Sequence, residues 1–338
     1  MSLLSVNDLS VAIKTPDGVL RTVDGVSFDV AAGESVGIVG ESGSGKTQTA
    51  LAIMGLLPWN AKARGSIAFD GAELLRMRAS KLNRIRGAQI ALVFQDPKTS
   101  LNPHLTIGVQ MAEIAERHLG VSRHEALQQS AQMLDRVRLS GAANALTRYP
   151  HEFSGGMRQR IAIAMMLLCK PKLLIADEPT SALDVTIQAQ ILALLAELQR
   201  DLGLAVILIS HDLGVVAELC TRTLVMYAGR IMESAPTAAL LAQPRNPYSR
   251  ALLASRLRVD ARRRSLLPSI PGQAPTLDER KAGCPFHPRC GAAFDRCAKE
   301  RPMLRATGGG TTSACHRDEG ASPSPDSEFT SKTVGKPL

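Results

Sequence analysis

Residues 40–47 read Gly-Glu-Ser-Gly-Ser-Gly-Lys-Thr, and this stretch decides the fold class. It satisfies the pattern G-x-x-x-x-G-K-[ST] of a phosphate-binding loop. An apolar run at 35–39 precedes it and predicts a short buried strand, while residues 46–54 follow with helical composition. A glycine-rich turn between a strand and a helix N-terminus presents backbone amides to an anion. The stretch therefore predicts an α/β domain that binds a nucleotide.

The residues of this loop have separate expected tasks. The amides of residues 43–47 would face the β-phosphate, Lys46 would reach the β- and γ-phosphates, and Thr47 would ligate Mg²⁺. The expected ATP-binding residues are Gly40, Ser42, Gly43, Ser44, Gly45, Lys46, Thr47 and Gln48.

A second motif lies at residues 173–178, which read Leu-Leu-Ile-Ala-Asp-Glu. An apolar strand that ends in two acids has the form of a Walker B segment. Asp177 would hold Mg²⁺ directly or through water, and Glu178 would polarise the attacking water as a general base. The alternative is that the acids cap the N-terminus of a following helix, a position that acids favour.

A third motif lies between the first two, where residues 153–160 read Phe-Ser-Gly-Gly-Met-Arg-Gln-Arg. Its hydroxyl, two exposed amides and helix N-terminus would make a second phosphate cradle. Because the first loop already holds the nucleotide of this subunit, a second cradle implies that nucleotide is sandwiched against another subunit. In isolation, the Ser-Gly-Gly stretch would be better explained as a simple cap of the helix from Met157, and only the remaining motifs favour the cradle.

Residues 153–160 also resemble the signature of ABC-transporter ATPases, and three further residues fit that family. Gln95 resembles the Q-loop residue that senses Mg²⁺ and water, Asp184 ends a stretch that resembles the D-loop, and His211 resembles the switch histidine at the γ-phosphate. Six such elements follow one another in the order of the family.

The resemblance implies a role for each matching position. The residues implied in catalysis are Lys46, Gln95, Glu178 and His211. Those implied to bind Mg²⁺ are Thr47, Gln95 and Asp177. Those implied to contact the nucleotide of a partner subunit are Ser154, Gly155, Gly156 and Met157.

Two features depart from the family pattern. Phe153 and Met157 stand where Leu and Gln are usual, although the phosphate-binding Ser-Gly-Gly is intact. The aromatic side chain that stacks on adenine in the early strands is missing, and the nearby position is Ile13. We therefore expect weaker or less selective binding of the base.

The remaining pattern predicts an ABC-type P-loop ATPase core over residues 1–235, with an antiparallel β subdomain and a helical insertion. Residues 3–13 and 19–30 alternate apolar and polar residues around a Thr-Pro-Asp-Gly turn, which predicts a hairpin. Helical periodicity places the insertion at about 99–160. Further strands, several of them continuously apolar as in a sheet covered on both faces, are predicted at 66–69, 89–94, 173–176, 205–209 and 223–227.

From about residue 236 the composition changes to Pro, Arg and Gly, which predicts a small Cys-rich module over 236–317 and a disordered tail over 318–338. The spacing C-x5-C-x6-C-x17-C is looser than common zinc knuckles, and four thiolates are the number that an iron–sulfur cluster needs. A zinc site, with His287 or His316 as substitute ligands, and unligated thiols are the alternatives. The four cysteines are Cys284, Cys290, Cys297 and Cys315.

The resemblance narrows to the ATPases of oligopeptide/dipeptide importers and extends to about residue 317. Its most diagnostic stretches are Asn-Pro-Tyr-Ser at 246–249 and Cys-Pro-Phe-His-Pro-Arg-Cys at 284–290. It implies transport-coupled ATP hydrolysis and a [4Fe–4S] cluster on the four cysteines. The implied partners are a second homologous ATPase subunit, two transmembrane permeases and, through the permeases, an extracytoplasmic substrate-binding protein.

Bulk properties fit this interpretation. The 338 residues are 45% hydrophobic but only 3% aromatic, so the core should be aliphatic, and the scarcity of base-stacking side chains argues weakly against nucleic acid. The net charge of +9 favours anionic partners. The start has no secretory signal, and the longest apolar run, 161–169, is far short of the roughly 20 residues that span a bilayer. We therefore expect a peripheral subunit on the cytoplasmic face of the bacterial inner membrane. The alternative is a soluble ABC ATPase that acts on nucleic acid or ribosomes.

Overall fold

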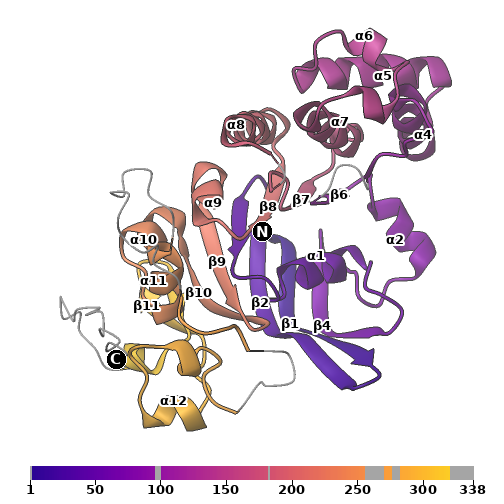
Figure 1. The fold of residues 1–338 in the computed structure, drawn as a ribbon. Coiled ribbons are helices and arrows are strands. Elements are labelled where there is room, and N and C mark those ends of the chain that lie inside the picture. The colour runs from indigo at the N-terminus through magenta and orange to yellow at the C-terminus, as the bar shows by residue number, and fades with distance from the viewer. Residues whose placement is uncertain (1, 96–99, 182, 256–269, 276–281, 320–338) are drawn as a thin grey trace.

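The structure is a computed structural model that describes residues 2–95, 100–181, 183–255, 270–275 and 282–319. Its described residues form two sheets (Figure 1). The larger sheet has eight strands in these ranges, in the order β11 (Arg305–Gly308), β12 (Thr311–Ser313), β10 (Arg230–Pro236), β9 (Arg222–Tyr227), β3 (Ser35–Val39), β8 (Ala205–Ser210), β7 (Leu173–Asp177) and β6 (Ile90–Val93). The smaller has four, in the order β2 (Gly18–Ala31), β1 (Ser2–Thr15), β4 (Ala61–Phe69) and β5 (Ala72–Glu73).

The centre of the larger sheet, from β9 to β6, is parallel and covered on both faces. Alternate residues of each strand enter two separate cores. In β7, Leu174 and Ala176 join one core, while Leu173 and Ile175 join the other. This explains why the strands have continuously apolar sequences, because neither face is left to solvent.

The smaller sheet contains the predicted hairpin, with β1 antiparallel to β2 and Thr15 opposite Gly18 at the turn. Strand β4 begins at Ala61, earlier than the sequence pattern predicted. Helix α1 (Lys46–Met54), which has the predicted bounds, shares one core with both sheets. The phosphate-binding loop is therefore supported from two sheets.

Helices cover the other face of the larger sheet and extend beyond β6. Helices α4 (Ile107–Leu119), α5 (Arg123–Arg136), α6 (Ala142–Ala145) and α7 (Gly155–Leu167) gather in one lobe, and α8 (Val185–Leu202) and α9 (Leu213–Leu219) lie beside it (Figure 1). Gly120, with φ 68°, ends α4, and a capping box at Ser122 starts α5. A short helix α2 (Ala79–Ile85) precedes β6.

The segment after residue 236 is continuous with the main sheet, because β12 pairs with β10 and β11 pairs with β12. Its helices are α10 (Thr237–Ala242), α11 (Pro247–Ala254) and α12 (Asp295–Lys299), at the end of the larger sheet opposite to the helical lobe (Figure 1). The expected tail begins in a 3-10 turn, His316–Glu319, and its residues 320–338 lie outside the described residues. In the described part of the chain, no helix is long and apolar enough to cross a membrane.

Candidate functional site

The carboxyl ends of the five parallel strands lie along one edge of the larger sheet. Val39 pairs with both Ser210 and Val225, Asp177 pairs with Ile209, and Val93 pairs with Ala176. The residues that follow these strands therefore emerge at one edge, where parallel sheets place their ligand sites. The motif residues that emerge there are Gly40, Gln95, Glu178 and His211.

The loop at 40–47 depends on its glycines. Gly45 has φ 101° and caps α1, and a Cβ there would lie 2.7 Å from the carbonyl oxygen of Thr22. At Gly40, a Cβ would lie 2.1 Å from the carbonyl oxygen of Met226. Backbone from β2 and β9 thus packs against the loop so closely that no side chain fits.

Lys46 lies inside this loop. Its ammonium donates to the carbonyl oxygens of Gly40 at 2.8 Å and Glu41 at 3.0 Å, and the residue is only 6% exposed. Burial lowers the pKa of Lys46, and the acids around it, including Glu178 and Asp177, act in the opposite direction. A desolvated cation with exchangeable carbonyl partners is suited to phosphate oxygens.

Asp177 ends β7 and is 6% exposed. Burial raises the pKa of Asp177, while its hydrogen bond with Thr47 and the charge of Lys46 act to lower it. A buried carboxylate beside a hydroxyl is a hard-oxygen pair of the kind that Mg²⁺ prefers. The oxygen Oε1 of Gln48 is buried nearby in sequence with no hydrogen-bond partner among the described residues. These donors fit a magnesium nucleotide.

Two of the predicted residues converge on the carboxylate of a third. Oε2 of Glu178 accepts a hydrogen bond from Gln95 Nε2 at 3.2 Å, and Oε1 lies 3.2 Å from Nδ1 of His211. Each residue follows a different strand. Glu178 has φ 46°, and its amide donates to the carbonyl oxygen of Ile209. A left-handed backbone at a non-glycine residue costs about 1–3 kcal/mol and is typical of functional sites.

The alternative that Asp177 and Glu178 cap a helix is wrong, because the N-cap of α8 is Asp184, whose Oδ1 accepts from the amide of Ile187 at 2.9 Å. The predicted D-loop residue therefore has a capping contact. Ile13, the position nearest to the expected adenine-stacking aromatic, is half-buried in β1 and pairs with Leu20.

The third motif lies at the start of α7. Ser154 caps this helix, with its hydroxyl accepting from the amide of Met157, so the capping interpretation is correct as far as it goes. Ser154 and Gly155 are exposed, and Gly156 packs so tightly on Ile187 that a Cβ would lie 2.7 Å from its Cγ2. Among the described residues, no hydrogen bond or ion pair joins this motif to the loop at 40–48.

The four clustered cysteines line one small cavity, together with Phe286 and the main chain around His316. Gly283 permits this approach, because a Cβ there would lie 2.4 Å from the carbonyl oxygen of Cys297. Burial raises the pKa of the Cys284 and Cys315 thiols to about 11. Within the described ranges, no group of three or more His, Cys, Asp or Glu is arranged to hold a metal ion.

Sequence reasoning missed two residues at the loop. Arg289 and Tyr248 come from the segment after residue 236, yet both contact Glu41, the second residue of the loop. Both belong to the stretches 246–249 and 284–290 that stood out in the sequence, but only the fold brings them to the loop. The cysteine segment, remote in sequence from the loop, is therefore adjacent to it in space.

Comparison with known proteins agrees with this arrangement. Residues 23–181 match the family model described as ABC transporter, and residues 232–297 match the oligopeptide/dipeptide transporter C-terminal region. The oligopeptide transport ATP-binding protein OppD of Salmonella typhimurium is 51% identical over 315 residues, covering 93% of each chain. The dipeptide transport ATP-binding protein DppD of Escherichia coli is 45% identical, covering 94% of this chain and 97% of the relative.

A solved structure shows the same fold. The dimeric post-hydrolysis state of an ATP-binding cassette bound to ADP and Pi is 26% identical and superposes with a TM-score of 0.63. The match covers 69% of this chain and 98% of that one.

The glycines of the loop give a stability test. Gly45→Ala should lower the free energy of unfolding by more than about 3 kcal/mol, since it adds a clash with Thr22 to a strained φ. Gly43→Ala is the matched control: its φ is 76°, but a Cβ there meets nothing within 4 Å, so only strain of about 1–2 kcal/mol is expected. Denaturant unfolding without nucleotide measures both. Equal losses would contradict the close packing of β2 on Gly45.

Proposed function

This chain belongs to the ABC transporter ATP-binding subunits of the oligopeptide/dipeptide type, and from that premise we propose that it energises a peptide importer by ATP-driven closure onto a second ATPase subunit. It hydrolyses ATP, as its family does. The observation that carries the assignment of the reacting centre is the convergence of Gln95 and His211 on the carboxylate of Glu178.

In the proposed reaction, Glu178 accepts a proton from the water that attacks the γ-phosphate. Gln95 and His211 orient that carboxylate from two sides, and His211, 62% exposed at its side chain, is accessible to the terminal phosphate. Lys46 exchanges its carbonyl partners in the loop for oxygens of the β- and γ-phosphates. The amides of residues 43–47 hold the β-phosphate at the N-terminus of α1.

Thr47, Gln95 and Asp177 would hold Mg²⁺, which when bound neutralises charge on the β- and γ-phosphate oxygens. Asp177 is buried and its pKa is raised by burial, so a divalent cation would compensate an otherwise costly carboxylate.

The exposed Ser154 and Gly155, together with the half-buried Gly156 and Met157, would act on nucleotide held by the partner ATPase. Two features support this proposal: the motif has no polar link to its own loop in the described residues, and the solved cassette with ADP and Pi is dimeric. Asp184 would lie at the same interface.

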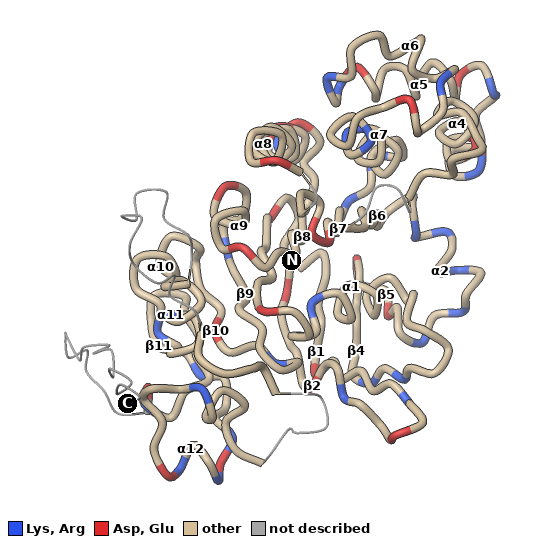
Figure 2. The backbone as a smooth tube through the Cα atoms, viewed as in Figure 1, with Lys and Arg blue, Asp and Glu red and all other residues tan. Residues whose placement is uncertain are grey.

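The other proposed partners are two transmembrane permeases and, through them, an extracytoplasmic binding protein, with the chain peripheral on the cytoplasmic face of the inner membrane. The relatives named as peptide-transport ATP-binding proteins support this proposal. Among the described residues, Lys and Arg occur on several separate elements, including α2, α4, α5 and the region of α12, with Asp and Glu between them (Figure 2). This distribution supports a partner other than nucleic acid. Co-purification of permeases from membranes, rather than of nucleic acid, tests this assignment.

We further propose that Cys284, Cys290, Cys297 and Cys315, in a module spanning about 236–317, hold a [4Fe–4S] cluster. The shared cavity and the number of thiols support the donor set, and zinc on the same residues is the alternative. Such a cluster would join Cys297 of α12, Cys315 after β12, and Cys284 and Cys290 on either side of the turn at 287–289, and no step of hydrolysis depends on it.

Glu178→Gln should bind Mg-ATP and accumulate the closed dimer while turnover falls by at least about a hundredfold, because a general base contributes roughly 10²–10⁴-fold. Nucleotide binding, size-exclusion chromatography and phosphate release measure the three properties. Glu197→Gln, which removes an exposed partner of Arg138 on α8, is the control and should keep turnover. Turnover at the wild-type rate in Glu178→Gln would refute the assignment of the base.

Gly155→Asp should leave ATP binding by the isolated chain unchanged and suppress dimer formation, since the new carboxylate would meet the phosphates of the partner's nucleotide. The site tolerates a Cβ, which would lie 3.6 Å from Leu183. Equilibrium nucleotide titration and light scattering of the ATP-bound Glu178→Gln background provide the readouts. Loss of ATP binding by the monomer would mean that the motif serves its own loop.

Anaerobic purification should yield a brown protein that contains iron and acid-labile sulfide, and Cys290→Ser should lose both. Cys169→Ser, outside the cavity, is the matched control and should keep them. Stoichiometric zinc without sulfide, or protein without metal, would exclude the cluster.

A further inference from the structure

The second residue of the phosphate-binding loop, Glu41, is held by residues from the far end of the chain. Its carboxylate accepts two hydrogen bonds from Arg289, Nη1 to Oε2 at 2.6 Å and Nη2 to Oε1 at 3.0 Å. Its amide donates to the hydroxyl of Tyr248 at 3.0 Å. Its carbonyl oxygen accepts from Lys46 Nζ at 3.0 Å. Every polar group of Glu41 is thus engaged, and two of them by the segment after residue 236.

Arg289 is held in this contact by burial and by further hydrogen bonds. Its side chain is 5% exposed, and its remaining donors reach the carbonyl oxygens of Ile270 and Pro271 and the hydroxyl of Tyr227. The hydrogen bonds with Glu41 raise the pKa of the Arg289 guanidinium, which is charged at any working pH. A bidentate arginine–carboxylate pair fixes the direction of both planes.

Tyr248 is positioned as firmly. It is fully buried in α11, and its ring packs on Tyr227 and Phe286 with centroid distances of 4.5 and 5.2 Å. Asn246 starts α11 by accepting from the amide of Tyr248, and its side-chain amide donates to the carbonyl oxygens of Met232 and Ala314. The Asn-Pro-Tyr stretch therefore ties α11 to the main sheet and aims one hydroxyl at the loop.

These contacts matter for binding because Glu41 brings a negative charge into a loop that must accept a polyphosphate. An unpaired carboxylate there would repel the phosphates and would leave the first residues of the loop without a fixed orientation. Pairing with Arg289 removes both effects. The same residue supplies an acceptor to Lys46, so its orientation bears on the lysine that reaches the phosphates.

We propose that Arg289 and Tyr248 are positioning residues for ATP binding: they hold Glu41, and through it the phosphate-binding loop, in the conformation that accepts the nucleotide. The proposal rests on the assignment of residues 40–48 as the nucleotide loop. On this proposal, the affinity of the phosphate-binding loop for ATP depends on contacts made by the segment after residue 236.

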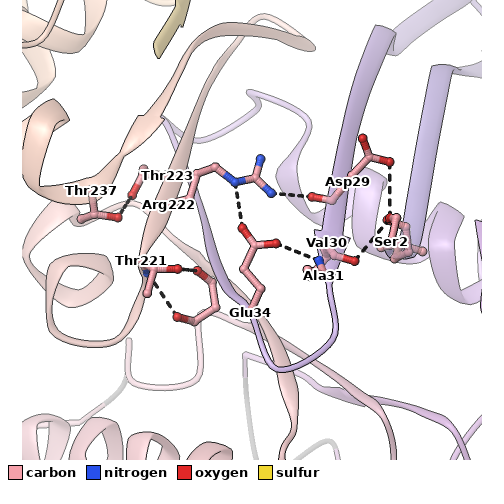
Figure 3. A network of polar contacts seen from close by, with 11 residues as sticks. Ser2, Asp29, Val30, Ala31, Glu34, Thr221, Arg222, Thr223 and Thr237 are labelled. Carbon is pink, nitrogen blue, oxygen red and sulfur yellow. Dashed lines mark hydrogen bonds and ion pairs between the residues drawn. The ribbon is translucent and has the colours of Figure 1, made fainter. Parts of the chain in front are cut away.

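A second arginine–glutamate pair provides the control. Arg222 Nε donates to Glu34 Oε1 at 2.8 Å, and the guanidinium also donates to the carbonyl oxygen of Asp29 (Figure 3). Like Arg289, Arg222 joins the second half of the chain to the first, with its side chain 26% exposed. Arg222 lies at the start of β9, opposite Val36, at the edge of the sheet away from the loop.

The test is a double-mutant cycle on the full chain, with the dissociation constant for ATP read by titration calorimetry and the midpoint of thermal unfolding read without nucleotide. Arg289→Ala and Glu41→Gln should each weaken ATP binding by about tenfold, and the double variant should bind ATP no more weakly than either single variant.

Tyr248→Phe, which leaves the cysteine segment and the ring packing intact, should weaken ATP binding by about threefold. Arg289→Lys should restore part of the affinity, since it keeps the charge but not the bidentate geometry.

Arg222→Ala should lower the unfolding midpoint without changing ATP affinity. The proposal is overturned if Arg289→Ala, Glu41→Gln and Tyr248→Phe bind ATP as the wild type does, or if the effects of the first two simply add. Should Arg289→Ala not fold, the other two variants decide, because neither alters the buried arginine. Wild-type protein that binds no ATP would instead overturn the assignment of the loop itself.

Discussion

The parallel register of β9, β3, β8, β7 and β6 is the constraint on which the site depends. Hydrogen bonding between parallel strands fixes which residues lie opposite one another. The residues that follow β3, β6, β7 and β8 are therefore brought to one edge of the sheet. A shift of one residue in β7 would exchange Asp177 and Glu178 between the strand and the turn, and would move Leu174 and Ile175 into the opposite cores. The two aliphatic cores therefore keep Asp177 and Glu178 in position, because they fix the register of β7.

A strained backbone and close packing both occur at this edge. Glu178 has a left-handed backbone, and the loop glycines touch carbonyl oxygens of β2 and β9. Such conformations persist only where the surroundings over-determine them, as the sheet does through the bond from the Glu178 amide to Ile209. The helical lobe carries the exposed Ser154 and Gly155 at the start of α7, so this motif and the phosphate-binding loop belong to different parts of the same chain.

The local elements could be predicted from the sequence because their causes are local. The hairpin, the bounds of α1 and the central strands follow from alternation, glycine placement and apolar runs. That Gln95 and His211 lie against Glu178 could be expected only from the family resemblance, because 83 residues separate Gln95 from Glu178 in the chain. The pairing of β12 with β10 was missed, because a three-residue strand, Thr311–Ser313, has no periodicity to read.

The segment after residue 236 makes direct polar contacts with the first part of the chain. Asn246 bonds to Met232 and Ala314, Arg301 reaches Asp24 of β2, and Arg289 reaches Glu41. The last two contacts join this segment to β2 and to the phosphate-binding loop, and the bond to Met232 joins the start of α11 to β10. A buried bidentate pair keeps its orientation only while both backbones are fixed. The turn at 287–289, which lies between Cys284 and Cys290, and the loop at 40–47 are therefore parts of one packing arrangement, because Arg289 belongs to the turn and Glu41 belongs to the loop.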